Sequence, residues 1–283
     1  MSVTWIIEPD VCAAYCDSLV AEIASQGHVH KTIPAHYTSL DWGDTSRYYD
    51  EFAPKGSCVV CHASFQFTIQ VAEDELWAPG VYGSRDTTDC TQYFPRFEDC
   101  LLNRDHEIIA VSELHGRGDL LFKSFGVDDR IFIRPNSGTK SFAGRLFNRS
   151  ELNTGLSRST MSPHALVVVS RPKSICREWR FVVADRCVIA ASMYKDREGT
   201  RMSPDVSQEA FEFAAVVAAR DFQPDRVWVL DTCETAEGEM KVVEINGFSS
   251  SSWYCCSVTD VVTAVSRVAV DDWKRSMAHL GEP

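Results

Sequence analysis

Apolar runs bounded by turn residues predict that strands dominate the middle of the chain. Residues 165–169 form a continuous apolar run, which is typical of a strand buried on both faces. Residues 179–184 and 187–193 predict a hairpin that turns at two polar residues between them. Residues 227–230 and 240–245 predict two more strands, joined by a polar turn.

Helical patterns lie at the two ends of the chain and between the strands. Residues 10–27, 207–220 and 258–280 predict helices, the first beginning at an aspartate and ending at a glycine. Residues 57–69 predict a further strand, and residues 98–104 predict a short helix. This mixture predicts an α+β or mixed α/β fold.

Composition indicates a globular chain without broad affinity for polyanions. Of its 283 residues 45% are hydrophobic, which is enough for one large domain or two modest ones. The formal net charge of -12 argues against broad binding to nucleic acids or anionic membranes, because both need basic surfaces. No apolar run approaches the roughly 20 residues of a membrane helix, and no secretory signal is visible. We therefore expect a cytoplasmic protein whose 11 cysteines are reduced, buried thiols.

Three oxygen-bearing side chains stand at the ends of two predicted strands. Asp231 ends one strand, and Glu244 and Asn246 end the next. If these strands pair antiparallel, the three side chains meet at one end of the sheet. Two carboxylates and an amide suit Mg²⁺, which also takes phosphate oxygens as ligands. Ordinary polar strand ends are the alternative, but Glu244 stands between Val243 and Ile245, and a carboxylate among apolar residues needs a partner or a metal.

A short polar loop with flanking cations lies between predicted strands at 130–134 and 142–147. Arg134 and Lys140 bracket a Pro-Asn-Ser-Gly-Thr sequence, and such loops let backbone N–H groups approach phosphate oxygens. The Gly-Thr-Lys-Ser stretch is similar to the tail of a Walker A loop. The earlier glycine of that motif is missing and residues 142–144 continue as a strand, so a P-loop is excluded. A hairpin turn with solvated basic ends is equally compatible with this loop taken alone.

A second arginine lies inside a predicted strand. Glu178 and Arg180 are two residues apart, so they share one face of that strand. An arginine among apolar strand residues needs a carboxylate or a bound anion as its partner. A Glu–Arg pair inside the sheet is the alternative to an anion site.

Taken in order along the chain, these segments resemble the ATP-grasp superfamily. The Leu-Asp at 230–231 and the Val-Glu-Ile-Asn-Gly at 243–247 resemble the metal signature Asp…Glu-x-Asn, the most specific of the matches. The Ile-Phe-Ile-Arg-Pro at 131–135 resembles the strand whose cation contacts the nucleotide phosphates. Arg134 stands there in place of the usual lysine, as in a bacterial and phage peptide-ligase-like branch. The resemblance covers roughly residues 110–283.

The resemblance implies roles for individual residues. The implied metal ligands are Asp231, Glu244 and Asn246. The implied catalytic cations are Arg134, Lys140 and Arg180. The backbone of the strand that begins at residue 165 would read the edge of adenine. The residues implied to contact the nucleotide are Arg134, Lys140, Ser141, Val168, Val169, Ser170, Glu178, Asp231 and Glu244.

The resemblance also implies a fold and an activity. The expected fold is α+β, with an ATP-grasp domain of antiparallel-rich sheets and flanking helices at 109–283, preceded by a smaller α/β substrate-side domain at 1–108. The expected activity is ATP- and Mg²⁺-dependent ligation of a carboxylate to an amine through an acylphosphate. The substrates would be small molecules or peptides, and the protein would act as a monomer or homodimer without nucleic acid or membrane. A phosphotransferase on the same fold and a non-catalytic nucleotide-binding module are the alternatives.

Overall fold

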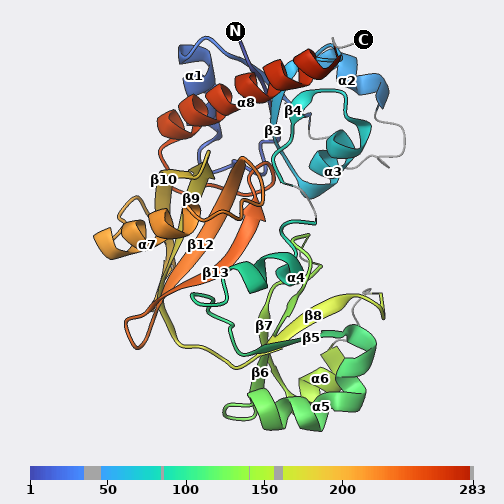
Figure 1. The fold of residues 1–283 in the computed structure, drawn as a ribbon, viewed down its shortest axis with the longest axis vertical. Coiled ribbons are helices and arrows are strands. Elements are labelled where there is room, and N and C mark those ends of the chain that lie inside the picture. The colour runs from blue at the N-terminus through green and yellow to red at the C-terminus, as the bar shows by residue number, and fades with distance from the viewer. Residues whose placement is uncertain (35–45, 84–85, 140, 156–161, 281–283) are drawn as a thin grey trace.

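The computed structural model describes residues 1–34, 46–83, 86–139, 141–155 and 162–280. Three sheets follow one another along the long axis of the molecule (Figure 1). We call them the parallel sheet, the large antiparallel sheet and the small antiparallel sheet. Hydrophobic cores lie on the faces of these sheets, and helices cover them.

The parallel sheet is built from the first part of the chain. Its strands, in spatial order, are β2 (Val29–Thr32), β1 (Thr4–Ile7), β3 (Cys58–His62) and β4 (Ala78–Gly80). Parallel neighbours need crossover connections, and helices supply them. These helices are α1 (Cys16–Ser25), α2 (Ser46–Phe52) and α3 (Phe65–Asp74).

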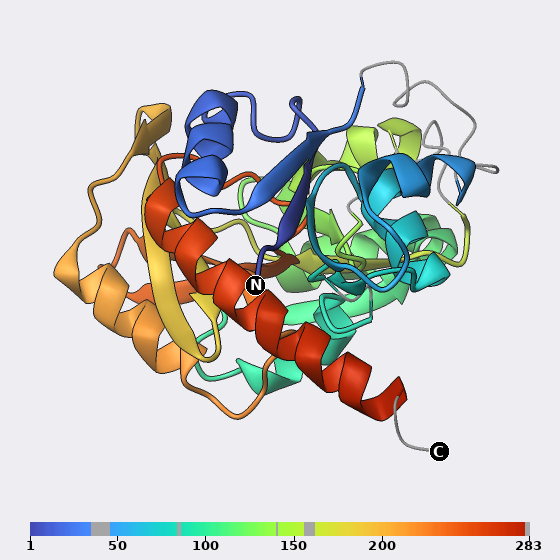
Figure 2. The same cartoon turned by 90° about the horizontal axis from the view of Figure 1, so that it is seen from above.

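The last helix of the chain packs on this first sheet. Helix α8 (Val258–Leu280) lies with α1 over one face, while α2 and α3 cover the other. In the view from above in Figure 2, α8 (red) runs diagonally across the molecule beside the N-terminal strands. The same core continues into the large antiparallel sheet through Val182 and Val229. Helix α8 therefore joins the parallel sheet and its helices, which we call the N-terminal unit, to the rest of the molecule.

The small antiparallel sheet occupies the opposite end of the molecule (Figure 1). Its strands, in spatial order, are β5 (His106–Ala110), β8 (Leu166–Ser170), β6 (Arg130–Pro135) and β7 (Arg145–Asn148). Helices α5 (Val111–Phe125) and α6 (Arg149–Gly155) cover one face. The sequence predicted a domain boundary between residues 108 and 109, and strand β5 spans this position. The division into domains at 1–108 and 109–283 stays a prediction.

The large antiparallel sheet lies between the other two. Its strands, in spatial order, are β11 (Gly199–Ser203), β10 (Cys187–Asp196), β9 (Ile175–Ala184), β12 (Val227–Thr235) and β13 (Met240–Gly247). Phe181 and Leu230 face helix α7 (Gln208–Ala218), and their neighbours Val182 and Val229 face α8. This alternation follows from the two-residue period of a strand. The short helix α4 (Cys90–Tyr93) and the 3-10 turn after it (Phe94–Arg96) join the core on the α7 side.

The fold confirms the α+β class expected from the sequence, with several local differences. The helix at 258–280 and both hairpins of the large antiparallel sheet are confirmed. The strand predicted at 57–69 is wrong in its second half, because α3 begins at Phe65 and turns Phe67 and Val71 toward the core at helical spacing. The helix predicted at 98–104 is absent from these described residues, where Leu101 instead forms a single β-bridge to Val242.

Two general expectations concern the environment of the chain. All 11 cysteines are free, and most are buried, as the sequence predicts. Among the described residues, no helix combines the length and the apolar character needed to cross a membrane.

Candidate active site

A row of polar side chains crosses four strands of the large antiparallel sheet. Ser192 of β10 lies opposite Arg180 of β9 in the pairing register. Arg180 lies opposite Asp231 of β12, and Asp231 lies opposite Glu244 of β13. Residues directly opposite one another project from the same face of a sheet. The register therefore gathers residues that are far apart in sequence, as the predicted antiparallel pairing required.

Arg180 is held by the Asp231 carboxylate. Its Nε donates to Oδ1 at 2.8 Å and its Nη2 donates to Oδ2 at 2.7 Å. Its Nη1 donates to the carbonyl oxygen of Ser252 at 2.8 Å, and its guanidinium lies 4.8 Å from the ring centroid of Tyr254. Burial lowers the pKa of Arg180, but the charge of Asp231 more than offsets this, and the pKa is raised overall. The arginine therefore stays cationic, with Asp231 rather than Glu178 as its partner.

Arg134 reaches from the small antiparallel sheet to the large one. It stands near the end of β6, and its Nη2 lies 2.9 Å from Oε2 of Glu244 in β13. Arg134 is 6% exposed. Burial lowers the pKa of its guanidinium, but nearby Tyr93 and Glu244 reverse the effect and raise the pKa overall. This buried ion pair links the expected phosphate-binding strand to the expected metal ligands.

Asp231 and Glu244 converge on one hydrogen-bond donor. Asn246 Nδ2 donates to Asp231 Oδ2 at 3.2 Å and to Glu244 Oε1 at 3.1 Å. A site where two carboxylate oxygens surround one donor group also suits a cation. Rotation of the amide would turn its own oxygen toward that cation, since amide O and N are assigned from hydrogen bonding. This oxygen donor set therefore fits Mg²⁺.

The protein alone supplies too few ligands to complete the coordination of a metal ion at this point. Among the described residues, no group of three or more His, Cys, Asp and Glu side chains is placed to hold a metal ion. Mg²⁺ is commonly held by one or two carboxylates together with waters and substrate phosphates. The two carboxylates and the amide therefore match a site that a nucleotide completes.

A cavity of about 430 Å³ lies between the two antiparallel sheets, next to Glu244. We call it the basic cavity, because five cations and two acids line it. The acids are Glu178 and Glu244. The cations are Arg134, Arg145, Arg171, Lys173 and Lys195. An excess of cations in a partly closed space attracts a polyphosphate.

Glu178 is fixed by two donors from the neighbouring strand. Lys195 Nζ lies 2.6 Å from its Oε1, and Tyr194 Oη donates to its Oε2 at 2.8 Å. Tyr194 in turn stacks on Tyr254 with ring centroids 5.2 Å apart. Glu178 thus lines the cavity, with Lys195 as a partner that the sequence did not indicate, and its contact with a nucleotide stays a prediction.

The predicted adenine-reading residues lie inside the small antiparallel sheet. Val168 and Val169 are buried in β8, which pairs with β5 on one side and β6 on the other. Ser170 donates from its hydroxyl to Asn103 Oδ1 at 3.1 Å. The backbone of β8 is therefore committed to the two ladders. Arg171 and Lys173, just after this strand, line the cavity instead.

The sequence contained a signal for these missed cations. Arg171 and Lys173 follow the apolar run at 165–169 directly, and the end of a buried strand is where a side chain first reaches a cavity. Arg145 and Lys195 gave a weaker signal, because each reaches the cavity only through pairing of its strand with the preceding one.

The loop after β6 is attached to the start of helix α4. Asp89 accepts from the backbone N–H of Gly138 at 3.2 Å and from Asn136 Nδ2 at 3.4 Å. A Cβ at Gly138 would stand 2.4 Å from Thr88 Oγ1, so a larger residue here would force the Thr88 side chain to shift. Ser141 is exposed, and the predicted cation Lys140 lies outside the described residues.

Comparison with known proteins bears directly on this arrangement. A family model described as an ATP-grasp domain, clade family 3, matches residues 68–266, more than half of the chain. The chain belongs to this ATP-grasp family. The match begins inside α3, so the ATP-grasp pattern extends further toward the N-terminus than the resemblance seen from about residue 110. The replacement of the usual lysine by Arg134 stays a prediction.

Solved structures share the ATP-grasp fold at low sequence identity. D-cycloserine synthetase DcsG has a TM-score of 0.64 at 13% identity, covering 95% of this chain and 100% of that chain. The D-alanine-D-alanine ligase from Coxiella burnetii has a TM-score of 0.62 at 11% identity, covering 99% and 98%. ATP-grasp ligase PsnB, complexed with a minimal precursor, has a TM-score of 0.56 at 14% identity, covering 96% and 99%. A search among curated proteins found no match.

Proposed function

We propose that this protein is an ATP-dependent carboxylate–amine ligase. The observation that carries the proposal is the convergence of Asp231 and Glu244 on Asn246 at the rim of the basic cavity. In a chain of the ATP-grasp family, this arrangement suits a nucleotide whose phosphates reach Mg²⁺ held by these three side chains. Two of the similar structures are named ligases and the third is named a synthetase, which agrees with the same activity.

Arginines supply the electrostatics of the proposed reaction. Arg134 and the other cations of the basic cavity would bind the phosphate oxygens. Arg180, fixed by Asp231 and Ser252, would stabilise charge that develops on the transferred group. Mg²⁺, when bound, would neutralise phosphate charge. Residues 171–175, rather than 168–170, are the segment we propose to lie along the nucleotide base.

The proposed chemistry has two balanced steps. A carboxylate oxygen of the first substrate attacks the γ-phosphorus of ATP, the bond to the bridging oxygen breaks, and ADP leaves. The amine nitrogen of the second substrate then attacks the acyl carbon, inorganic phosphate leaves, and the nitrogen loses a proton. No covalent bond to the protein is needed, so catalysis would rest on positioning and electrostatics.

The substrates we propose are small molecules or peptides. The buried, free cysteines favour a reducing compartment, and we propose the cytoplasm. We also propose a monomer or homodimer that acts without nucleic acid, since the net charge is -12.

Product analysis tests the proposed ligase activity. Amino acids and peptides are supplied with Mg-ATP, ADP release is followed, and the product is identified by mass spectrometry. A ligase yields ADP, inorganic phosphate and an amide in equal amounts. Release of a stable phosphorylated product would instead establish a phosphotransferase, and binding of ATP without turnover for every acceptor tried would favour a binding module.

A further inference from the structure

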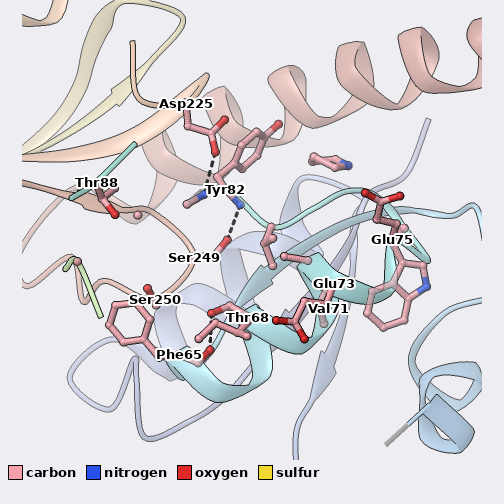
Figure 3. A pocket seen from close by; sticks show the side chains of 18 of the residues that line it. Phe65, Thr68, Val71, Glu73, Glu75, Tyr82, Thr88, Asp225, Ser249 and Ser250 are labelled. Atoms are coloured by element: carbon pink, nitrogen blue, oxygen red, sulfur yellow. Dashed lines mark hydrogen bonds between the residues drawn. The ribbon is translucent and has the colours of Figure 1, made fainter. Parts of the chain in front are cut away.

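A second cavity, of about 810 Å³, lies between the N-terminal unit and the end of β13 (Figure 3). Gly138 and Thr139 of the loop after β6 line one part of it. Gly247, the residue after Asn246, lines it as well. The cavity therefore adjoins the expected phosphate loop and the residue that directly follows the expected metal ligand Asn246.

Its walls are held together by a dense set of backbone contacts. Ser249 donates its N–H to the Tyr82 carbonyl oxygen at 2.9 Å, and its hydroxyl accepts from the Tyr82 N–H at 2.9 Å. The Ser249 carbonyl oxygen accepts from the Ala63 N–H at 2.8 Å. A Cβ at Gly247 would stand 2.8 Å from the Cα of Gly83, so the two segments cross in direct contact. The cavity is thus fixed by the chain rather than left by loose packing.

The charge of this second cavity is opposite to that of the basic cavity. Five acids line it, with no lysine or arginine among the described lining residues, and we call it the acidic cavity. Those acids are Glu73, Glu75, Asp86, Asp225 and Asp272. Figure 3 shows Glu73 and Glu75 near the end of α3 and Asp225 beside Tyr82. Such a lining favours a cation and repels a carboxylate.

Two of these acids belong to one small network. Tyr82 donates its hydroxyl to Asp272 Oδ2 at 2.8 Å, and the Gly83 N–H donates to Asp225 Oδ2 at 2.8 Å. Arg226 pairs with Asp272 from outside the lining. Burial, together with the charge of Asp272, still raises the pKa of Asp225 to about 6. Because Asp272 is already paired with Arg226, the charge available to a ligand comes mainly from the exposed acids of the lining.

Apolar side chains share the lining with these acids. Phe65 and Ile69 come from α3, and Trp77 and Val81 come from the segment around β4. A ligand with an aliphatic stem would bury it here, and its cationic group would lie near the carboxylates.

On the basis of the proposed ligase function, we propose that the acidic cavity binds the amine substrate, and that this substrate is an aliphatic amine with two basic nitrogens, such as a diamine or lysine. Its protonated nitrogen would lie near the carboxylates, while the other nitrogen, in its neutral form, would attack the acyl carbon of the acylphosphate past Gly138 and Gly247. The carboxylate substrate and ATP would be excluded from the same cavity by like charge.

Calorimetric titration of the full chain, in the presence of Mg-ADP, tests this inference. Three probes of similar length differ in charge: cadaverine, pentane-1,5-diol and glutarate. We expect cadaverine to bind at least about tenfold more tightly than the diol, with glutarate weakest, because several weak charge contacts add up. A diol or glutarate that binds as tightly as cadaverine would overturn the inference.

Matched variants separate the cavity from general surface charge. The triple variant Glu73→Gln, Glu75→Gln, Asp86→Asn alters exposed acids of the cavity, and cadaverine affinity is expected to fall about tenfold. The control variant Glu98→Gln, Asp105→Asn, Glu237→Gln removes three exposed acids elsewhere, and the affinity is expected to stay within about twofold. Equal losses in both would overturn the inference.

A filling variant gives the same test without altering charge. Ser250 lines the cavity, and Ser250→Trp is expected to block cadaverine while leaving Mg-ADP binding intact. Unchanged cadaverine binding in Ser250→Trp would contradict the assigned site.

Failure of this inference also differs from failure of the proposed function. Loss of charge preference with nucleotide turnover intact overturns the inference alone, whereas persistent cadaverine binding without turnover for any acceptor contradicts the ligase activity alone.

Discussion

Two cavities adjoin the segment between β6 and β7, and they carry opposite charge. The basic cavity lies between the antiparallel sheets and is lined by Arg134 and four further cations. The acidic cavity lies against the N-terminal unit and is lined by five acids. A reaction that joins an anionic nucleotide-activated acid to an amine gains selectivity from such a separation, because each substrate is repelled from the site of the other.

The two cavities also differ in how their charges are held. In the basic cavity, Glu244 pairs with Arg134 across two sheets, and next to it Asp231 pairs with Arg180. Asp231 and Arg180 are buried and fixed by strand register, while Arg134 is buried and placed by the packing of the two sheets. In the acidic cavity, Glu75 and Asp86 are exposed at helix ends and loops. The first arrangement preorganises a reaction centre, while the second leaves acids accessible to a ligand.

The largest expected effect is the loss of stability when a buried ion pair is broken, compared with the removal of an exposed acid. Arg180→Met removes the guanidinium from a carboxylate that is 1% exposed, and we expect a loss of about 3–5 kcal/mol in the free energy of unfolding. Urea denaturation measures it. Glu75→Gln in the acidic cavity serves as the control, with an expected change within about 0.5 kcal/mol. An Arg180→Met protein as stable as the wild type would contradict the proposed difference between the buried ion pairs and the exposed acids.

A smaller effect is expected at Gly247, which lines the acidic cavity and directly follows the predicted metal ligand Asn246. Gly247→Ala places a Cβ 2.8 Å from the Cα of Gly83, so the two segments must move apart, at a cost of about 1–3 kcal/mol. Cadaverine binding should weaken more than Mg-ADP binding, because Gly247 lines the acidic cavity. Gly116→Ala is the control, since nothing lies within 4 Å of a Cβ there. Equal stability of the two variants would show that the close contact is unimportant.

The smallest expected effect is on pH dependence. The pKa of Asp225 is raised to about 6 by burial and by Asp272, while Arg226 opposes the shift and Tyr82 lies beside it. A carboxyl whose pKa is raised on folding stabilises the fold below its unfolded pKa, and this contribution is lost as the pH rises through about 6. Thermal unfolding of the wild type, compared with Asp225→Asn between pH 4 and 7, should show this loss. Parallel pH profiles for the two proteins would refute it.

The convergence of the three predicted metal ligands could be predicted from sequence because it depends on local rules. Strand ends, a two-residue spacing and one hairpin were enough to bring Asp231, Glu244 and Asn246 together. The pairing of Arg134 with Glu244 was not predictable, because it needs the relative placement of two sheets. The strand at 166–170 was predicted correctly, but sequence alone did not reveal that its backbone is paired on both sides.

The acidic cavity was beyond sequence reasoning for a physical reason. Its lining comes from α3, the segment around β4, the loop after β6 and helix α8, which meet through tertiary packing. None of its acids stands in a recognisable spacing. The helix predicted at 258–280 was correct in its bounds, yet its packing on the first sheet had no local signal.

Magnesium-dependent nucleotide binding tests the central claim most directly. ADP is titrated into the full chain by calorimetry, with Mg²⁺ or with EDTA, for the wild type, Glu244→Gln, Asn246→Ala and the control Glu237→Gln. We expect Mg²⁺ to tighten ADP binding at least about tenfold in the wild type and the control. This gain should disappear in Glu244→Gln and Asn246→Ala. An unchanged Mg²⁺ dependence in both of these variants would contradict the assignment of the metal site.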